Sequence, residues 1–117
     1  MSIESIDRKP PIAERRPQQR KRVLMSGIVI YSDGAYSFDC TFRNLSKTGA
    51  LVAVGKNTPF PSEFYLIVIR DGTAYQAKVI RNNGSEVGVR FQKKLLLAEK
   101  IDPSLNYLKR LWIARTT

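Results

Sequence analysis

Apolar and polar residues alternate along most of the chain between about residues 23 and 92. The segment YSFDCTFR shows this clearly, because its aromatic residues and its cysteine occupy every second position from Tyr36 to Phe42. A period of two is typical of a strand with one buried face. The pattern returns in AYQAKVI, residues 74–80, and in EVGVRF, residues 86–91. It predicts six strands, at about 23–31, 36–44, 49–54, 63–70, 74–81 and 86–92.

Short sequences that contain Gly beside Asp or Asn separate several of these strands. They are SDG at residues 32–34, DG at 71–72 and NG at 83–84. Asx-Gly pairs accept the positive φ that tight hairpin turns require. Repeated antiparallel hairpins at this spacing predict an all-β fold, either a small antiparallel β-barrel or a sandwich.

A C-terminal helix is predicted at about residues 103–115. Asp102 supplies an N-cap, and Pro103 presets φ for the first turn. We expect the apolar stripe of this helix to pack against the barrel, and a dimer or partner surface is the alternative. The preceding segment KKLLLAEK is either a short helix or a last extended segment. The stripe consists of Ile101, Leu105, Leu108 and Trp112.

The first 22 residues have a different composition. They are polar, contain three prolines, and carry seven basic residues between Arg8 and Arg22 against the single acid Glu14. Such a segment is predicted to be a flexible arm that does not fold on its own. The chain therefore divides into an arm at 1–22, a barrel at 23–92 and a C-terminal segment at 93–117.

The charge of the chain indicates an anionic partner. Lys and Arg number 20 against 10 Asp and Glu, which gives a formal charge of +10. Nucleic acid, a nucleotide, an acidic protein and lipid head groups all fit this excess. Charge alone therefore does not choose among them.

The chain lacks the residues most used in enzyme and metal chemistry. It has no histidine, and Cys40 is its one cysteine, which excludes an internal disulfide and a Cys-based metal cage. We therefore expect no enzyme, no metal site and no cofactor, and we expect Cys40 to be a buried, inert thiol. Neither a membrane span nor the apolar core of a signal peptide is present in the sequence, which favours a cytoplasmic protein.

The arm contains a pair of arginines four residues apart. They are Arg16 and Arg20, with Arg15 beside them, just before the first predicted strand. Guanidinium groups pair bidentately with phosphate oxygens or with the O6 and N7 atoms of guanine, and they stack on purines. By itself, however, a basic arm is more often a solvated tail or a nonspecific polyanion binder.

A second polar motif, NLSKTG, lies between the second and third predicted strands. Asn44 and Ser46 are two residues apart, so on an extended backbone their side chains share a face and can meet a guanine edge. Gly49 permits a close backbone approach or a positive φ. Taken alone, the motif is an ordinary turn.

The combination of Arg-x-x-x-Arg, Asn-x-Ser-x-x-Gly and the later VGVRF at 87–91, in this order, resembles the PilZ family of cyclic di-GMP receptors. The resemblance implies a six-stranded antiparallel β-barrel with a C-terminal helix and an N-terminal arm that folds over the ligand. One departure is Arg81, where many members of the family have a tryptophan that stacks on guanine. The implied ligand-binding residues are Arg15, Arg16, Arg20, Asn44, Ser46 and Gly49.

The resemblance implies a bacterial cyclic di-GMP receptor or adaptor. Ligand binding would order the arm and signal to a downstream protein partner that controls motility, exopolysaccharide production or biofilm formation. No specific nucleic acid is expected as partner. Two alternatives stay open: a basic β-barrel that binds nucleic acid, and a ligand-free adaptor that uses the helix stripe as its interface.

Overall fold

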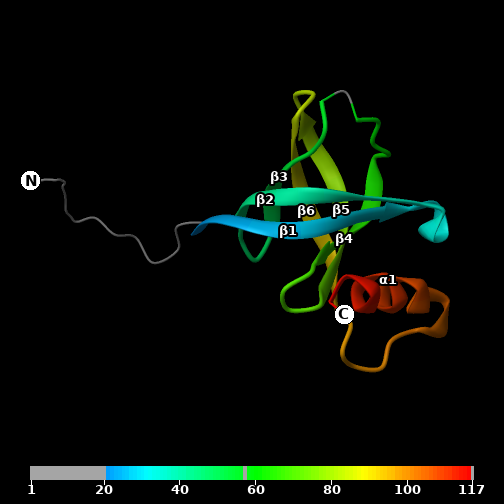
Figure 1. Cartoon of the computed structure of the whole chain (residues 1–117). Coiled ribbons are helices and arrows are strands. Elements are labelled where there is room, and N and C mark those ends of the chain that lie inside the picture. Colours follow the sequence, from blue (N-terminus) through cyan, green and yellow to red (C-terminus); the bar gives the residue numbers. More distant parts are fainter. Residues whose placement is uncertain (1–20, 57, 117) are drawn as a thin grey trace, which may run out of the picture.

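The structure is a computed structural model that describes residues 21–56 and 58–116, with side chains from residue 25 onward. Six strands form a closed barrel in the order β1-β2-β3-β6-β5-β4, and all neighbours are antiparallel (Figure 1). The strands are β1 Lys21–Tyr31, β2 Tyr36–Leu45, β3 Gly49–Ala53, β4 Glu63–Val68, β5 Thr73–Asn82 and β6 Glu86–Leu96. A short 3-10 turn, η2 at Pro103–Leu105, leads into the helix α1, Asn106–Thr116. The predicted six-stranded antiparallel barrel with a C-terminal helix is confirmed.

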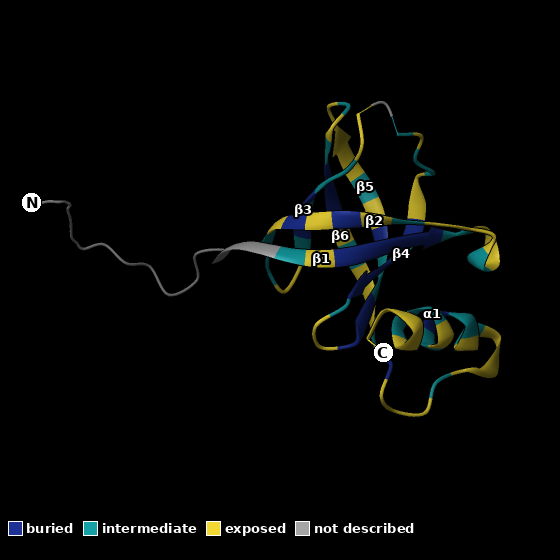
Figure 2. Ribbon diagram, in the orientation of Figure 1, coloured by how far each residue is buried: buried dark blue, intermediate teal, exposed yellow. Residues whose placement is uncertain are grey.

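Two buried layers hold the fold together. One fills the barrel interior, and the other lies between the outer surface of the barrel and α1. β1 contributes to both, because Val29 points into the interior whereas Ile28 and Ile30 point outward under the helix, and all three are buried (Figure 2). β4 is buried on both faces in the same way, with Leu66 inside and Ile67 outside. The continuous apolar runs in these two strands therefore reflect burial on both faces.

The apolar stripe of α1 packs against the barrel, as predicted. Leu108 is fully buried in the outer layer, and Leu105 and Trp112 pack at its edge. The indole N–H of Trp112 donates a hydrogen bond of 2.8 Å to the backbone carbonyl of Ile69, directly after β4. Leu108 is thus covered by the protein's own barrel, whereas Leu105 and Trp112 are half-buried.

The segment KKLLLAEK is extended through Leu96. β6 therefore continues four residues beyond the predicted end at 92, pairing with β5 as far as Thr73 opposite Leu96. Leu97 then enters the outer layer, where it is fully buried. Three consecutive leucines fit a helix as well as a strand, and the partner strand β5 decides between them.

The glycines of the three predicted turns all have positive φ, at +93° for Gly34, +70° for Gly72 and +101° for Gly84. In the first turn Ser32 and Asp33 also have positive φ, at 53° and 55°. This conformation is rare for residues with a side chain, although Asp adopts it more readily than most. The hairpin between β1 and β2 therefore has a tightly curled tip, η1 at Ser32–Gly34.

Replacing Gly72 with Ala is expected to loosen α1. A Cβ at this position would lie 2.4 Å from Cζ2 of Trp112, whereas a Cβ at Gly84 meets nothing within 4 Å. Positive φ destabilises Ala by about 1 to 2 kcal/mol at either position, and overpacking against Trp112 adds about 1 to 3 kcal/mol at Gly72 alone. Urea unfolding of both variants measures the difference, and the fluorescence of the single tryptophan reports its displacement. Equal losses of stability would contradict this packing role.

Candidate functional site

The start of β1 lies beside the end of β2. Lys21 pairs with Leu45 and Arg22 pairs with Asn44 in the antiparallel register. β1 therefore begins next to the NLSKTG turn (Figure 1). Arg15, Arg16 and Arg20, which the sequence analysis assigned to the ligand, lie outside the described residues.

A bulge at Arg43 sets the direction of Asn44. Phe42 pairs with Val52 and Asn44 pairs with Leu51, so Arg43 is an extra residue in β2. Phe42 and Val52 are buried in the barrel interior. Without the bulge, alternation would return Asn44 to that interior; with it, Asn44 lies beside Leu51 on the outer face and is half-buried.

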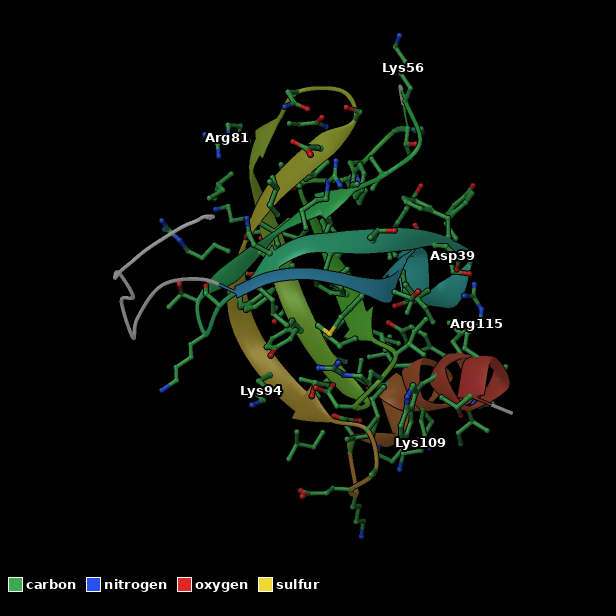
Figure 3. All side chains as sticks on the ribbon, turned by 60° about the vertical axis from the view of Figure 1, so that its left-hand side comes forward. Asp39, Lys56, Arg81, Lys94, Lys109 and Arg115 are labelled. Atoms are coloured by element: carbon green, nitrogen blue, oxygen red, sulfur yellow. The ribbon has the colours of Figure 1, made fainter. Side chains whose placement is uncertain are left out.

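Asn44 begins a row of outward-facing residues that crosses four strands. Leu51 pairs with Gly88, and Gly88 pairs with Arg81. Neighbouring strands are about 4.8 Å apart, so the row from Asn44 to Arg81 is about 14 Å long. Arg81 projects outward from the β5–β6 hairpin (Figure 3).

Gly88 leaves room for the side chain of Arg81. A Cβ on Gly88 would lie 3.7 Å from Cβ and 3.9 Å from Nε of Arg81. Gly88 is buried although it faces outward, and Arg81 is exposed. The side chain of Arg81 therefore lies over Gly88, with its guanidinium group accessible on the outer face.

The Ser46 hydroxyl organises the turn. Its oxygen accepts hydrogen bonds from the backbone N–H groups of Thr48 (3.3 Å) and Gly49 (3.2 Å). The Ser46 hydroxyl also donates a hydrogen bond of 3.1 Å to the backbone carbonyl of Gly49. The same carbonyl accepts a second hydrogen bond, from the backbone N–H of Ser46. Because one hydroxyl donates once and accepts twice, these three bonds occupy its full capacity. In this structure Ser46 shapes the turn and has no spare hydrogen bond for a ligand.

Gly49 is required by the neighbouring strand. A Cβ there would lie 2.3 Å from the carbonyl oxygen of Val89 in β6. Gly49 does not have a positive φ. A glycine is needed here because the backbones approach closely. The contact holds β3 close to β6, next to the pairing of Gly49 with Arg90.

Further basic residues lie on the same outer face. Gly49 pairs with Arg90, and Arg90 pairs with Lys78, so a second row runs parallel to the first. Arg90 and Lys78 are both exposed. Lys78 was not singled out from the sequence, and only the pairing of β5 with β6 shows that it is a neighbour of Arg90. Arg43 is held by Glu86, with 3.1 Å between Nε and Oε2.

The described residues offer little for catalysis or metal binding. Cys40 is buried, and desolvation, followed by the nearby Asp39, raises the pKa of its thiol to about 12. A thiol with this pKa stays protonated and unreactive at neutral pH. Over residues 21–56 and 58–116, no group of three His, Cys, Asp or Glu side chains could hold a metal ion. Within the same part of the chain, no helix is long and apolar enough to cross a membrane.

Comparison of the sequence with family models identifies one family. The sequence model of the family described as "PilZ domain" matches residues 14–102. Among solved structures, the PilZ domain of CeSA from a cellulose-synthesizing bacterium is similar, with a TM-score of 0.48 and 20% sequence identity. The similarity covers 85% of this chain and 99% of that chain. No curated protein matches the chain.

Ser46→Ala is expected to lower the free energy of unfolding by about 1 to 2 kcal/mol, because two backbone N–H groups lose their acceptor. Thr48→Ala is the matched control, since Thr48 is exposed and only its backbone takes part in the turn; it should change stability by less than about 0.5 kcal/mol. Urea unfolding compares the two. A stable Ser46→Ala variant that no longer binds ligand would reassign the hydroxyl from the turn to the ligand.

Proposed function

The chain belongs to the PilZ domain family, and from this premise we propose that it binds cyclic di-GMP and acts as a signalling adaptor. The ligand would occupy the outer face of the barrel where β1 begins. The proposal is one of binding without catalysis, and it involves no metal ion or cofactor. The process under control would be motility, exopolysaccharide production or biofilm formation, through a downstream protein partner.

One observation carries this proposal. The pairing of Lys21 with Leu45 and of Arg22 with Asn44 joins the arm to the barrel at the Asn-x-Ser-x-x-Gly turn. Arg20 immediately precedes this pairing in sequence, and Arg16 is four residues earlier. Two motifs separated by more than twenty residues in the sequence would thus be available to one ligand.

The chemistry of the ligand matches these residues. Cyclic di-GMP has two phosphodiester charges and two guanines, and arginine can pair with either part. The bulge turns Asn44 to the outer face, and an amide side chain contains groups of the kinds that pair with a guanine edge. Ser46 and Gly49 would contribute by fixing the shape of the turn, because the hydroxyl is fully used and the glycine contacts β6. Because Asn44 faces outward beside Leu51, we assign it a part in base recognition together with the arm arginines.

Arg81 is proposed as a stacking surface for a guanine. Its side chain lies over Gly88, in the same outward row as Asn44. A guanidinium plane stacks on a purine and adds a positive charge near the phosphates. Arg81 would thereby take the place of the tryptophan found in many members of the family, with a weaker apolar contact.

Single substitutions in the arm should weaken binding of cyclic di-GMP. A hydrogen bond to a charged group contributes about 1.5 to 3 kcal/mol, so Arg16→Ala and Arg20→Ala should each lower the affinity about ten-fold to over a hundred-fold. Arg81→Ala should lower it by about three- to ten-fold. Isothermal titration at moderate salt, with GMP and cyclic AMP as controls, measures these changes, and the stoichiometry separates one bound ligand from two.

Arg8→Ala is the matched control for these titrations. It removes the same charge from the arm but lies outside both motifs and outside the family match. Its affinity should stay within about two-fold of the parent protein, because unpaired charges act weakly through solvent. If the parent protein does not bind cyclic di-GMP but binds oligonucleotides with a steep salt dependence, the receptor assignment is wrong and the nucleic-acid alternative replaces it.

Ligand binding should order the arm. Seven positive charges between Arg8 and Arg22 repel one another, and the ligand supplies the opposing charge. We expect the backbone amides of residues 8–22 to show slower, more restricted motion in ¹⁵N relaxation after cyclic di-GMP is added, while those of β4 change little. Equal relaxation with and without ligand would reject the switch and leave the binding proposal standing.

A further inference from the structure

A small recess lies where the tip of the β1–β2 hairpin, β4, β5 and the start of α1 meet. Its volume is about 180 Å³. The packing of Tyr107 on Gly34, where a Cβ would lie 2.9 Å from Cδ2 of the tyrosine, joins the helix to the hairpin tip. The polar and aromatic residues that line the recess are Tyr31, Asp33, Glu63, Tyr65, Gln76 and Tyr107.

The recess is negatively charged on a strongly positive protein. Asp33 and Glu63 are exposed, and within residues 21–56 and 58–116 neither carboxylate makes a salt bridge. Lys78 lies opposite Glu63 in register but forms no ion pair with it. Asp39 and Glu86, by contrast, are paired with Arg115 and Arg43, as Figure 3 shows for Asp39.

Burial and neighbouring groups raise the pKa of two tyrosines of the recess. Desolvation raises the pKa of Tyr107, and the neighbouring Tyr65 and Asp33 raise it further. The pKa of Tyr65 is also raised, mainly by desolvation and to a smaller extent by Asp102. Phenol rings beside free carboxylates form a surrounding that favours a cation, through cation–π contact and ion pairing.

The size of the recess indicates what fits. Sites for free small molecules usually enclose about 300 to 1,000 Å³, so 180 Å³ is too small for most of them. A recess of this size can hold one long side chain while the backbone of that residue stays outside. Arginine and aromatic anchors of this kind dominate binding at many protein interfaces.

The recess is separate from the proposed nucleotide site. It adjoins the end of β1 at Tyr31, whereas β1 begins at Lys21, about 30 Å away along an extended strand. The first basic row ends at Arg81, farther along β5 than Gln76 of the recess, whereas the second row reaches the recess at Lys78, which pairs with Glu63. A partner bound here would therefore leave the nucleotide site open.

We propose that the Asp33–Glu63–Tyr107 recess is a docking site for a lysine or arginine side chain of a protein partner. The cation lies between the two carboxylates, and its aliphatic stem contacts the rings of Tyr65 and Tyr107. This inference does not depend on binding of cyclic di-GMP. The expected partner is a protein with an exposed lysine or arginine on the surface that contacts the recess.

The test uses ¹⁵N-labelled full-length protein and three short Gly/Ser peptides that carry a central Lys, Arg or norleucine. The Lys and Arg peptides should shift the amide signals of Ser32–Ala35, Glu63–Tyr65 and Tyr107, and the norleucine peptide should not. Asp33→Asn with Glu63→Gln should weaken this binding about ten-fold, because both countercharges are lost while shape is kept. Glu99→Gln is a control for Glu63→Gln, since it removes an exposed carboxylate that does not line the recess.

Several results would overturn the proposal. Equal shifts with norleucine would show that the recess is not selective for charge, and equal weakening by Glu99→Gln would show a general charge effect. Binding of spermidine at much lower concentration than either peptide would assign the recess to a free polyamine. Self-association that the double variant abolishes would assign it to the basic arm of a second copy. Absence of any shift with Lys and Arg peptides would remove the site altogether.

Discussion

The pairing of β1 with two neighbours is the constraint on which the structure depends. β1 pairs with β2 along most of its length and with β4 over Gly27–Ile30, which closes the barrel. Closure leaves Ile28 and Ile30 on the outer surface, where they need a cover, and α1 supplies it. The start of β1 lies beside the NLSKTG turn, and the end of β1 lies beside the Asp33–Glu63–Tyr107 recess. Fold, nucleotide site and recess thus depend on the register of one strand.

Much of the fold could be predicted from sequence because its signals are local. Alternation, Gly-containing turns and the Asp102–Pro103 helix start all act within a few residues, and each appears in the structure. The extension of β6 to Leu96 could not be predicted, since it depends on pairing with Thr73 more than twenty residues away. The same holds for the exact positions of the bulges, which follow from closing the sheet.

The ligand-binding residues stay a prediction, and the structure adds local geometry at Asn44, Ser46 and Gly49 that the sequence does not contain. From sequence, Asn44 and Ser46 share a face because they are two residues apart. The bulge at Arg43 decides that Asn44 faces outward, and three hydrogen bonds hold the Ser46 hydroxyl in the turn. Gly49 is explained by the Val89 carbonyl, an atom forty residues away. The neighbourhood of Arg81, Gly88 and Asn44 likewise needs three strand pairings that no local pattern contains.

The bulge in β2 also ties the length of the chain to the direction of one side chain. If β2 kept all its residues but paired regularly, Asn44 would turn into the apolar interior beside Phe42 and Val52. Burying an amide without hydrogen-bond partners is costly, so that register would harm the barrel and the site together. Deletion of Arg43 has a different result, because Asn44 would follow Phe42 directly and still pair with Leu51 on the outer face. A redesign of this barrel therefore has to keep the extra residue and the bulge together, or remove them together.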